Sequence, residues 1–516
     1  MSYTEIFGLT ILISAIFGAL LFSKLFVKAG RQSWEAYIPV YNYVVLLDII
    51  ERPKWWIILL FIPVVGNIMI IILLYEFLHV FNYRKKRYAF FTIITLGLFL
   101  AYVNFDKKTK YIGKDNDVIL KNVTSWTNAI LFAVVAATLV HTYVMRPYTI
   151  PTSSLEKSLL VGDFLFVSKF HYGARIPMTP LALPMVHDSM PFTNLPSHIK
   201  KKPFQFPYLR LPGLQKIKTN DIVVFNWPAD TLKTMWGDNS GEFTYKPIDK
   251  KTNYVKRCVA IAGQTFEIRD GIIYIDGKRS IMPDRAKPQF NYKIEFKKNI
   301  NPSTLLSAYK VREARRTELG VLFNLDEENA TRIKNNPNVK SVERVIKPKG
   351  IFNKEVFPHD AQYPWNIDNF GPLYMPEKGA TVDLNEKTIP FYRDLLKRYE
   401  GINFSEAGGK YYVNGKAVTN YTFKQDYYWM MGDNRHYSLD ARFWGFTPFD
   451  HVVGKPVFIW MSWDKDGQGI GNKIRTERLF TTVGGSGKPV SYLYYFFGLL
   501  ALYIGYEVFK PKKEKY

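Results

Sequence analysis

The sequence predicts α-helical transmembrane segments joined to a mainly β domain outside the cytoplasm, with an inserted α+β subdomain. Long apolar runs lie towards both ends of the chain, short alternating segments fill its middle, and a basic stretch interrupts those segments. The chain has 516 residues, of which 47% are hydrophobic and 16% aromatic. It is therefore long and apolar enough to form packed cores in more than one domain.

Residues 1–121 are predicted to form an N-terminal membrane region, with helices near residues 6–22, 55–80 and 88–103. The first apolar run is followed by basic residues, whereas a cleaved signal sequence has basic residues before it. Pro63 and Gly66 interrupt the second run, which permits a re-entrant hairpin. The sequence leaves the number of membrane-spanning segments between three and five.

Two further apolar runs flank the middle of the chain. Residues 122–145 are predicted to form a transmembrane helix that leads into the β domain, and residues 488–516 a C-terminal transmembrane helix with a basic tail. Lysine and arginine favour the cytoplasmic side, so the tail is expected there and the intervening residues on the outer side. We therefore expect a multi-pass protein of the cytoplasmic (inner) membrane.

The middle of the chain is rich in strand-like segments that end in turn signals. Three examples are rich in Val, Ile, Tyr and Phe and are bounded by Gly, Asp or Asn: Asp221 to Trp227, Gly271 to Lys278 and Lys410 to Lys416. Residues 146–278 and 410–487 are therefore assigned to the mainly β domain. Residues 279–409 are more basic and also carry helix-like stretches, so they are assigned to the inserted subdomain.

Composition excludes several classes of protein. Cys258 is the single cysteine, and the eight histidines show no metal-binding spacing, so a metal site is not expected. The formal charge of +24 suits either nucleic acid or anionic lipid. Because the charge is spread along a chain whose main domain faces outward, we expect contact with lipid and none with nucleic acid.

Three short stretches carry candidate catalytic residues: Ile150 to Asp163, Tyr254 to Gly263 and Met431 to Gly445. A serine hydroxyl needs a base, and no histidine lies near the serines of the first stretch. Lys256 can act as the base if burial lowers its pKa by roughly 2–3 units from about 10.4. On a strand Lys256 and Arg257 point to opposite faces, so one can be buried while the other stays solvated.

The third stretch allows two interpretations. Ser438 can hold a buried amine by a hydrogen bond, while Asp440 and Arg442 can form an ion pair that stiffens the loop. Alternatively, His436 with Asp433 or Asp440 can serve as the base of a different serine hydrolase.

Taken together, these stretches resemble the motifs of bacterial type I signal peptidase, a membrane-anchored serine protease with a Ser–Lys dyad. The resemblance implies a catalytic domain of the signal peptidase type. The family's nucleophile lies eight residues before the Gly of a Gly-Asp pair. In this chain the pair is Gly162-Asp163, and Ser154, not Ser153, lies eight residues before Gly162. The resemblance also implies that Lys256 is the general base, that Thr152 completes the oxyanion hole, that Ser438 orients the lysine, and that Asp440 and Arg442 form the supporting ion pair.

This resemblance implies an endopeptidase that removes N-terminal signal peptides from secreted preproteins through an acyl-enzyme and without a cofactor. Its expected partners are secretory preproteins, membrane lipid and the secretion translocon. The chain departs from the family pattern at several positions; Lys157, for example, stands where the family has proline and places a cation near the nucleophile. The alternative function is a membrane-tethered scaffold or binding protein that retains an inactive protease fold.

Overall fold

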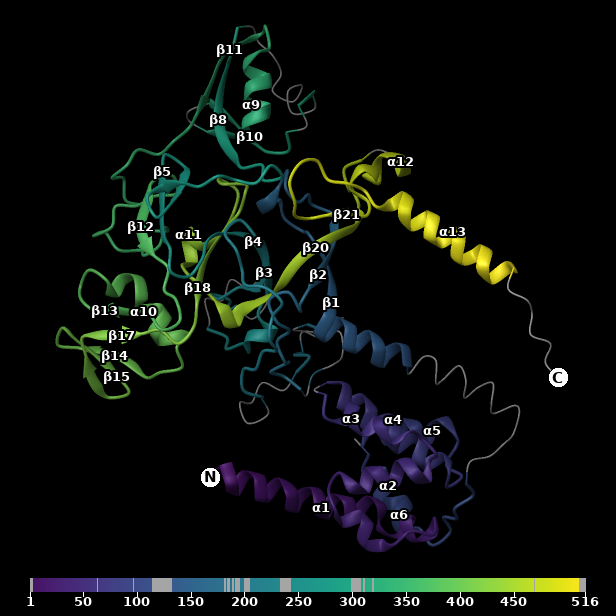
Figure 1. Ribbon diagram of the computed structural model, residues 1–516. Helices are drawn as coiled ribbons and strands as arrows, with labels where there is room; N and C mark the ends of the chain where they lie inside the picture. The colour runs from purple at the N-terminus through teal and green to yellow at the C-terminus, as the bar shows by residue number, and fades with distance from the viewer. Residues whose placement is uncertain are drawn as a thin grey trace. The chain divides into compact units, whose positions relative to one another are not determined.

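The chain folds into two compact units, Met1–Thr142 with Ile176–Pro207 and Tyr143–Arg175 with Tyr208–Tyr516, which are described separately. The computed structural model (Figure 1) describes residues 3–62, 64–95, 97–113, 132–180, 182, 186–187, 190, 195–198, 205–232, 243–297, 308–309, 311–317, 320–467 and 469–509. The first residues of the helix predicted over 122–145 lie outside these ranges.

The first unit is helical. Its core packs aromatic and aliphatic side chains of α1 against those of α4, including Phe22, Phe26 and Phe77. The buried amide of Asn104 joins α6 to α1, because its oxygen accepts from the Lys24 N–H at 2.9 Å. The helices are α1 (Tyr3–Lys28), α2 (Tyr41–Ile49), α3 (Ile57–Leu60), α4 (Val65–His79), α5 (Lys86–Ile94) and α6 (Phe99–Phe105), with 3-10 turns at Ser33–Tyr37 and Lys54–Trp56.

One helix of the described residues is long and apolar enough to cross a membrane, over Ile11–Lys28 of α1. Three other apolar helices are shorter: Val65–His79, Phe132–Val144 and Leu493–Tyr506. The helix predicted near 88–103 is instead two short helices, because α5 ends at Ile94 and Gly97 adopts a φ of 91°. The helix predicted near 55–80 is likewise broken, with a φ of 70° at Val64.

The second unit is built on an antiparallel sheet in the order β1-β2-β20-β3-β4-β18-β19, with β21 paired to β20. Both faces are covered: Val223 and Phe225 of β3 pack in one core cluster and Val224 in another, as the two-residue strand period dictates. The strands are β1 (Met145–Thr149), β2 (Asp163–Ser168), β3 (Ile222–Asn226), β4 (Asn253–Ala260), β18 (Tyr427–Met431), β19 (Thr447–Pro448), β20 (Val452–Ser462) and β21 (Thr481–Thr482).

Smaller sheets divide the stretch 279–409. One is β11-β8-β10-β9, formed by Val339–Arg344, Gln289–Phe296, Gly320–Asp326 and Ala314–Thr317, and it carries α9 (Glu327–Lys334). Another is β12-β5-β6-β7, in which β12 (Phe370–Tyr374) from inside the stretch pairs with β5 (Thr265–Arg269) from before it. The remaining elements are β6 (Ile272–Ile275), β7 (Lys278–Arg279), β13 (Thr381–Asp383), α10 (Ile389–Arg398), β14 (Phe404–Ala407), β15 (Lys410–Val413), β16 (Lys416–Val418) and β17 (Asn420–Thr422).

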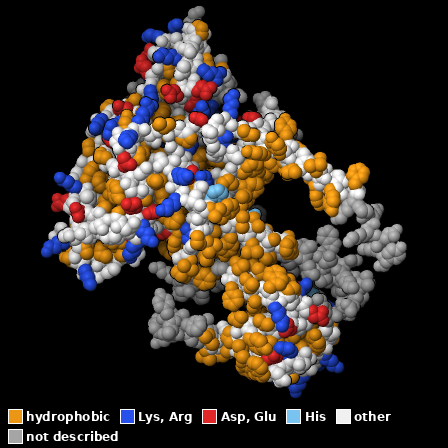
Figure 2. Space-filling view, viewed as in Figure 1, with side chains coloured by type: hydrophobic (Ala, Val, Ile, Leu, Met, Phe, Trp, Pro, Cys, Tyr) orange, Lys and Arg blue, Asp and Glu red, His pale blue; other side chains and the backbone are white. Residues whose placement is uncertain are grey.

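The second unit ends in α13 (Leu493–Phe509), whose surface is apolar (Figure 2). Its exposed large side chains include Tyr494, Tyr495, Phe497, Leu499, Leu502 and Tyr503. In the described part of the unit, α11 (Ala441–Trp444) and α12 (Gly469–Lys473) are each a single short helical turn.

Gly162 ends the loop between β1 and β2. It has a φ of +89°, and a Cβ there would lie 1.9 Å from the Trp463 carbonyl oxygen. The following residue, Asp163, is fully buried and accepts hydrogen bonds from the Leu160 N–H at 2.8 Å and the Ser462 hydroxyl at 2.7 Å. The Gly-Asp pair thus fixes the end of the loop that carries the candidate serines.

We expect Gly162→Ala to destabilise the protein by about 3 kcal/mol, because it combines left-handed strain with a backbone clash. Gly277→Ala is the matched control: its φ is +76° but nothing lies within 4 Å of its Cβ position, so strain alone should cost about 1 kcal/mol. Thermal unfolding of the solubilised protein measures both changes, and equal losses would contradict this interpretation of the turn.

Candidate active site

Ser154 lies in the loop that joins β1 to β2. Thr152 precedes a single 3-10 turn, Ser153–Leu155, which carries Ser154. The base of the loop is closed by hydrogen bonds from the Ile150 N–H to the Asp163 carbonyl and from the Gly162 N–H to the Ile150 carbonyl, both 2.9 Å long. Ser154 is only 7% exposed.

Lys256 reaches Ser154 from the middle of β4. Its Nζ lies 2.7 Å from the Ser154 Oγ, and the side chain is 4% exposed. The strand is held between β3, where Val223 is the partner of Lys256, and β18. Two residues 102 positions apart in the sequence are thereby brought within hydrogen-bond distance.

Burial lowers the pKa of Lys256 from 10.5 to about 8. The nearby carboxylates of Asp440 and Asp433 act in the opposite direction, while Arg442 adds to the lowering. The ammonium position also lies 5.2 Å from the ring centre of Tyr254, which covers it on one side. A substantial fraction of Lys256 is therefore neutral near pH 8, as a general base requires.

The loop after β18 holds the nucleophile turn in place. The Asn434 N–H donates to the Ser154 carbonyl, and the Asn434 side-chain amide donates to the Ser153 carbonyl, each at 3.1 Å. Gly432 allows this approach, since a Cβ there would lie 2.5 Å from the Ser154 carbonyl oxygen and 2.2 Å from the Ser438 Oγ. The glycine is thus dictated by close packing against the serine turn.

Asp440 and Arg442 form a buried ion pair. The Arg442 Nε and Nη2 each lie 2.9 Å from a different Asp440 oxygen. Arg442 is 1% exposed and Asp440 is 0% exposed. Asp440 also accepts from the Gly432 N–H at 3.0 Å. Burial alone would raise the pKa of Asp440, but Arg442 and these hydrogen bonds hold it below its usual value. The pair stiffens the loop that contacts Ser154.

Arg257 is buried as well, so the strand does not leave one of the two neighbouring cations solvated. Its exposure is 3%, and its guanidinium forms a bidentate ion pair with Asp433. The Nε lies 2.8 Å from Oδ1 and the Nη2 lies 2.6 Å from Oδ2. The Ser158 hydroxyl donates to the same carboxylate at 2.5 Å. Strand alternation does send Lys256 and Arg257 in different directions, but each direction is enclosed by protein.

Thr152 and Ser438 lie beside the pair without a hydrogen bond to it. Thr152 is exposed and precedes the Ser154 turn, and its side chain makes no capping bond. Ser438 is 7% exposed, and within the described residues its hydroxyl has no hydrogen-bond partner. The expected bond from Ser438 to the lysine is therefore absent from this conformation, although the Ser438 side chain lies next to Gly432.

The histidine alternative finds no geometric support. His436 Nε2 lies 3.3 Å from an Asp368 oxygen, and His436 Nδ1 accepts from the Asn291 N–H at 3.2 Å. Both ring nitrogens are thus occupied by neighbours other than Ser154. Ser153 is also engaged elsewhere, because its hydroxyl donates to Glu313.

Sequence reasoning missed Glu313 and Asn324. The Glu313 carboxylate accepts from the Asn434 side-chain amide at 2.8 Å and from the Asn324 side-chain amide at 2.9 Å. Asn324 also donates to the Asn434 side-chain oxygen at 2.6 Å. These residues belong to the β9–β10 region and contact the loop that holds Ser154, and no motif signal in the sequence marks them.

Two family models match parts of the chain. Residues 123–346 and 377–463 match the family described as signal peptidase, peptidase S26, and these stretches include Ser154, Lys256 and Asp440. Residues 34–114 match a family of unknown function (DUF5684).

Several curated proteins named signal peptidase I are similar to this chain over most of its length. The protein of Buchnera aphidicola (subsp. Acyrthosiphon pisum) is 23% identical over 378 residues, which cover 73% of this chain and 86% of that protein. That of Haemophilus influenzae is 25% identical over 361 residues, 68% of this chain and 74% of that protein. That of Helicobacter pylori (strain 26695) is 23% identical over 381 residues, 72% of this chain and 97% of that protein.

We expect Lys256→Met to stabilise the fold. Lowering the lysine pKa from 10.5 to about 8 costs the folded state about 3 kcal/mol at a pH below 8. Replacing the amine with an apolar side chain of similar length removes that cost but also removes a hydrogen bond of about 1 kcal/mol. The net gain should be about 2 kcal/mol at pH 7, and it should disappear as the pH rises towards 10.5, where the unfolded lysine is also neutral.

Thermal unfolding at pH 7 and pH 10 measures this effect. Lys416→Met is the control, because Lys416 is exposed on β16. A Lys256→Met protein that is less stable than the wild type at pH 7, or a gain independent of pH, would show that burial does not penalise the Lys256 ammonium.

Proposed function

The chain belongs to the signal peptidase family, peptidase S26, and on that premise we propose that Ser154 and Lys256 are its catalytic dyad. The protein is a serine endopeptidase that removes signal peptides from preproteins, as bacterial type I signal peptidases do. The observation that supports the dyad is the buried 2.7 Å contact between the Lys256 amine and the Ser154 hydroxyl. An inactive scaffold would have no need for this contact.

In the proposed mechanism, neutral Lys256 accepts the proton of the Ser154 hydroxyl while the Ser154 oxygen attacks the scissile carbonyl. The tetrahedral intermediate collapses to an acyl-enzyme, and the Lys256 ammonium returns its proton to the departing amine. Lys256 then accepts a proton from the water that attacks the ester. As the ester bond breaks, the Lys256 ammonium returns this proton to the Ser154 oxygen, and the cleaved signal peptide is released. The mechanism uses groups of this chain and water, and assigns no step to a metal or cofactor.

We assign the oxyanion hole to the Ser154 N–H and the Thr152 hydroxyl. Thr152 is exposed and two residues from the nucleophile, so its side chain is free to turn towards a bound substrate. For Ser438 we propose a positioning role. Its buried hydroxyl has no partner among the described residues, lies beside the Ser154 turn and is available to the Lys256 ammonium that forms during the reaction.

The protein is anchored to a membrane, and Ile11–Lys28 has the length and composition of a spanning helix. We propose further that it is a multi-pass protein of the inner membrane with its catalytic domain on the outer side. The exposed apolar surface of α13 and the lysines that follow it in the sequence support a second contact with lipid. Membrane lipid and the secretion translocon are its proposed neighbours.

We also propose that the inserted subdomain is narrower than residues 279–409. The sheet β11-β8-β10-β9 with α9 has a core of its own, whereas β12 and β13 pair with strands outside the stretch. On this view the insert runs from β8 to β11, and its contact through Glu313 supports the nucleophile turn.

Cleavage of a secretory preprotein by the purified, detergent-solubilised protein tests the dyad. Ser154→Ala and Lys256→Ala should each lower the rate by at least 1,000-fold, because nucleophile and base act as one unit. Ser153→Ala is the matched control, since its hydroxyl bonds to Glu313 and not to the lysine, and it should retain activity within about tenfold.

Unfolding profiles of the three variants establish that they are folded. Cleavage that survives Ser154→Ala or Lys256→Ala in folded protein would disprove the dyad. Loss of activity in Ser153→Ala alone would move the nucleophile to the neighbouring residue.

A further inference from the structure

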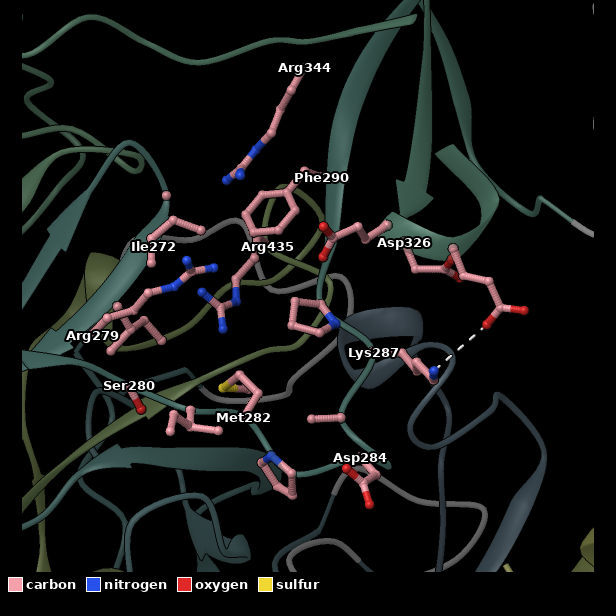
Figure 3. A pocket seen from close by; sticks show the side chains of 18 of the residues that line it. Ile272, Arg279, Ser280, Met282, Asp284, Lys287, Phe290, Asp326, Arg344 and Arg435 are labelled. Carbon is pink, nitrogen blue, oxygen red and sulfur yellow. Dashed lines mark ion pairs between the residues drawn. The ribbon is translucent and has the colours of Figure 1, made fainter. Parts of the chain in front are cut away.

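A pocket lies away from the Ser154–Lys256 contact, between the segment that follows β7 and the sheet that carries α9 (Figure 3). Its volume is about 780 Å³, which is the size of a pocket for a small organic molecule. Figure 3 shows the side chains of Arg279, Arg344 and Arg435 entering this space from different elements around Phe290.

The arginines lack partners within the described part of the chain. Arg435 is 4% exposed, and its Nε has no hydrogen-bond partner. The same holds for the buried Nε and Nη2 of Arg344. Arg279 is exposed at the rim and makes no ion pair among the described residues. Buried guanidinium groups normally bind carboxylates or phosphates, so guanidinium nitrogens without a protein partner at a cavity suit an anionic ligand.

The surrounding structure fixes the orientation of these groups. The Arg344 guanidinium lies 3.4 Å from the ring centre of Phe290, and that of Arg435 lies 5.9 Å from the same ring. A Cβ at Gly271 would lie 2.2 Å from the Arg344 Nη2, so a larger residue there would displace this guanidinium. Burial lowers the pKa of Arg435 to about 10, although Asp433 and Asp440 act against that shift. A bound anion would offset the cost of burying this charge.

Among the described residues, the acidic side chains of the pocket form no ion pair with the arginine cluster. Asp326 caps α9 and accepts from the Asn329 N–H at 2.7 Å. Glu328 lies 3.7 Å from Lys287, the contact drawn as a dashed line in Figure 3. Glu327 and Asp284 also line the cavity. Burial holds the pKa of Arg344 below its usual value, and it outweighs Glu327, which raises that pKa from a distance.

We propose that this pocket binds a phosphate group, carried either by a soluble molecule or by a lipid headgroup. Three guanidinium groups exceed the charge of one carboxylate, whereas a phosphate monoester carries about −1.5 to −2 at pH 7 and offers three acceptor oxygens. The cavity is much larger than a bare ion, and Ile272 and Met282 supply apolar surface for the rest of the ligand.

Calorimetric titration of the full-length, detergent-solubilised protein with inorganic phosphate, in phosphate-free buffer at pH 7, tests this proposal. Wild-type protein should bind phosphate saturably, and Arg344→Gln and Arg279→Gln should each weaken binding at least tenfold. Arg316→Gln is the matched control, because Arg316 is exposed on β9 and is not part of the pocket; it should bind as the wild type does.

The rate of preprotein cleavage by each variant shows that the fold is intact, since neither Arg344 nor Arg279 belongs to the dyad or its supporting loop. A short-chain phosphatidic acid, kept below its micelle concentration, distinguishes the two sources. Binding at least tenfold tighter than inorganic phosphate supports a lipid headgroup, and equal binding supports a soluble ligand. The proposal is overturned if the wild type shows no saturable phosphate binding, or if Arg344→Gln and Arg279→Gln bind phosphate as tightly as Arg316→Gln does.

Discussion

The contact between the Lys256 amine and the Ser154 hydroxyl requires that the structure exclude water from the Lys256 amine. At 4% exposure the ammonium loses most of its hydration, and this loss brings its pKa to about 8. The lysine therefore stands on β4, a strand with neighbours on both sides, in the long antiparallel sheet. The serine comes to it on a hairpin loop whose base is closed by backbone hydrogen bonds. The sheet thus supplies both the burial and the position of the pair.

The low pKa of Lys256 also requires that the charged groups around it be paired with one another. A free carboxylate close to Lys256 would stabilise the ammonium and cancel the effect of burial. Asp440 and Asp433 do lie near enough to raise the lysine pKa, yet each is held by its own arginine, Arg442 or Arg257. These buried pairs let the loop after β18 contact the Ser154 turn without placing an unpaired charge next to the base. These pairs position the loop and do not add much to the stability of the fold, because buried ion pairs contribute little to net stability.

The resemblance to the family motifs was sufficient to predict the parts of the site that lie inside short stretches. It selected Ser154, Lys256 and the ion pair of Asp440 with Arg442; in the structure the serine and lysine lie within hydrogen-bond distance and the ion pair forms, while the catalytic roles stay a prediction. It did not predict the partner of Arg257, which is 176 residues away, or the role of Glu313, which is 160 residues from Ser153. Such contacts depend on strand pairing, and a local pattern does not specify which strands pair. The division of 279–409 between several sheets escaped prediction for the same reason.

The dependence of kcat/KM on pH tests the central claim most directly, because it reports the ionisation of the free enzyme's base. If burial keeps Lys256 near a pKa of about 8, the rate should rise with pH as the ammonium loses its proton and reach half its maximum near pH 8. A soluble peptide with a signal-type cleavage site and no titrating group in this range is a suitable substrate. A profile that is flat between about pH 6 and 9, or that still rises tenfold per unit above pH 9, would contradict the account.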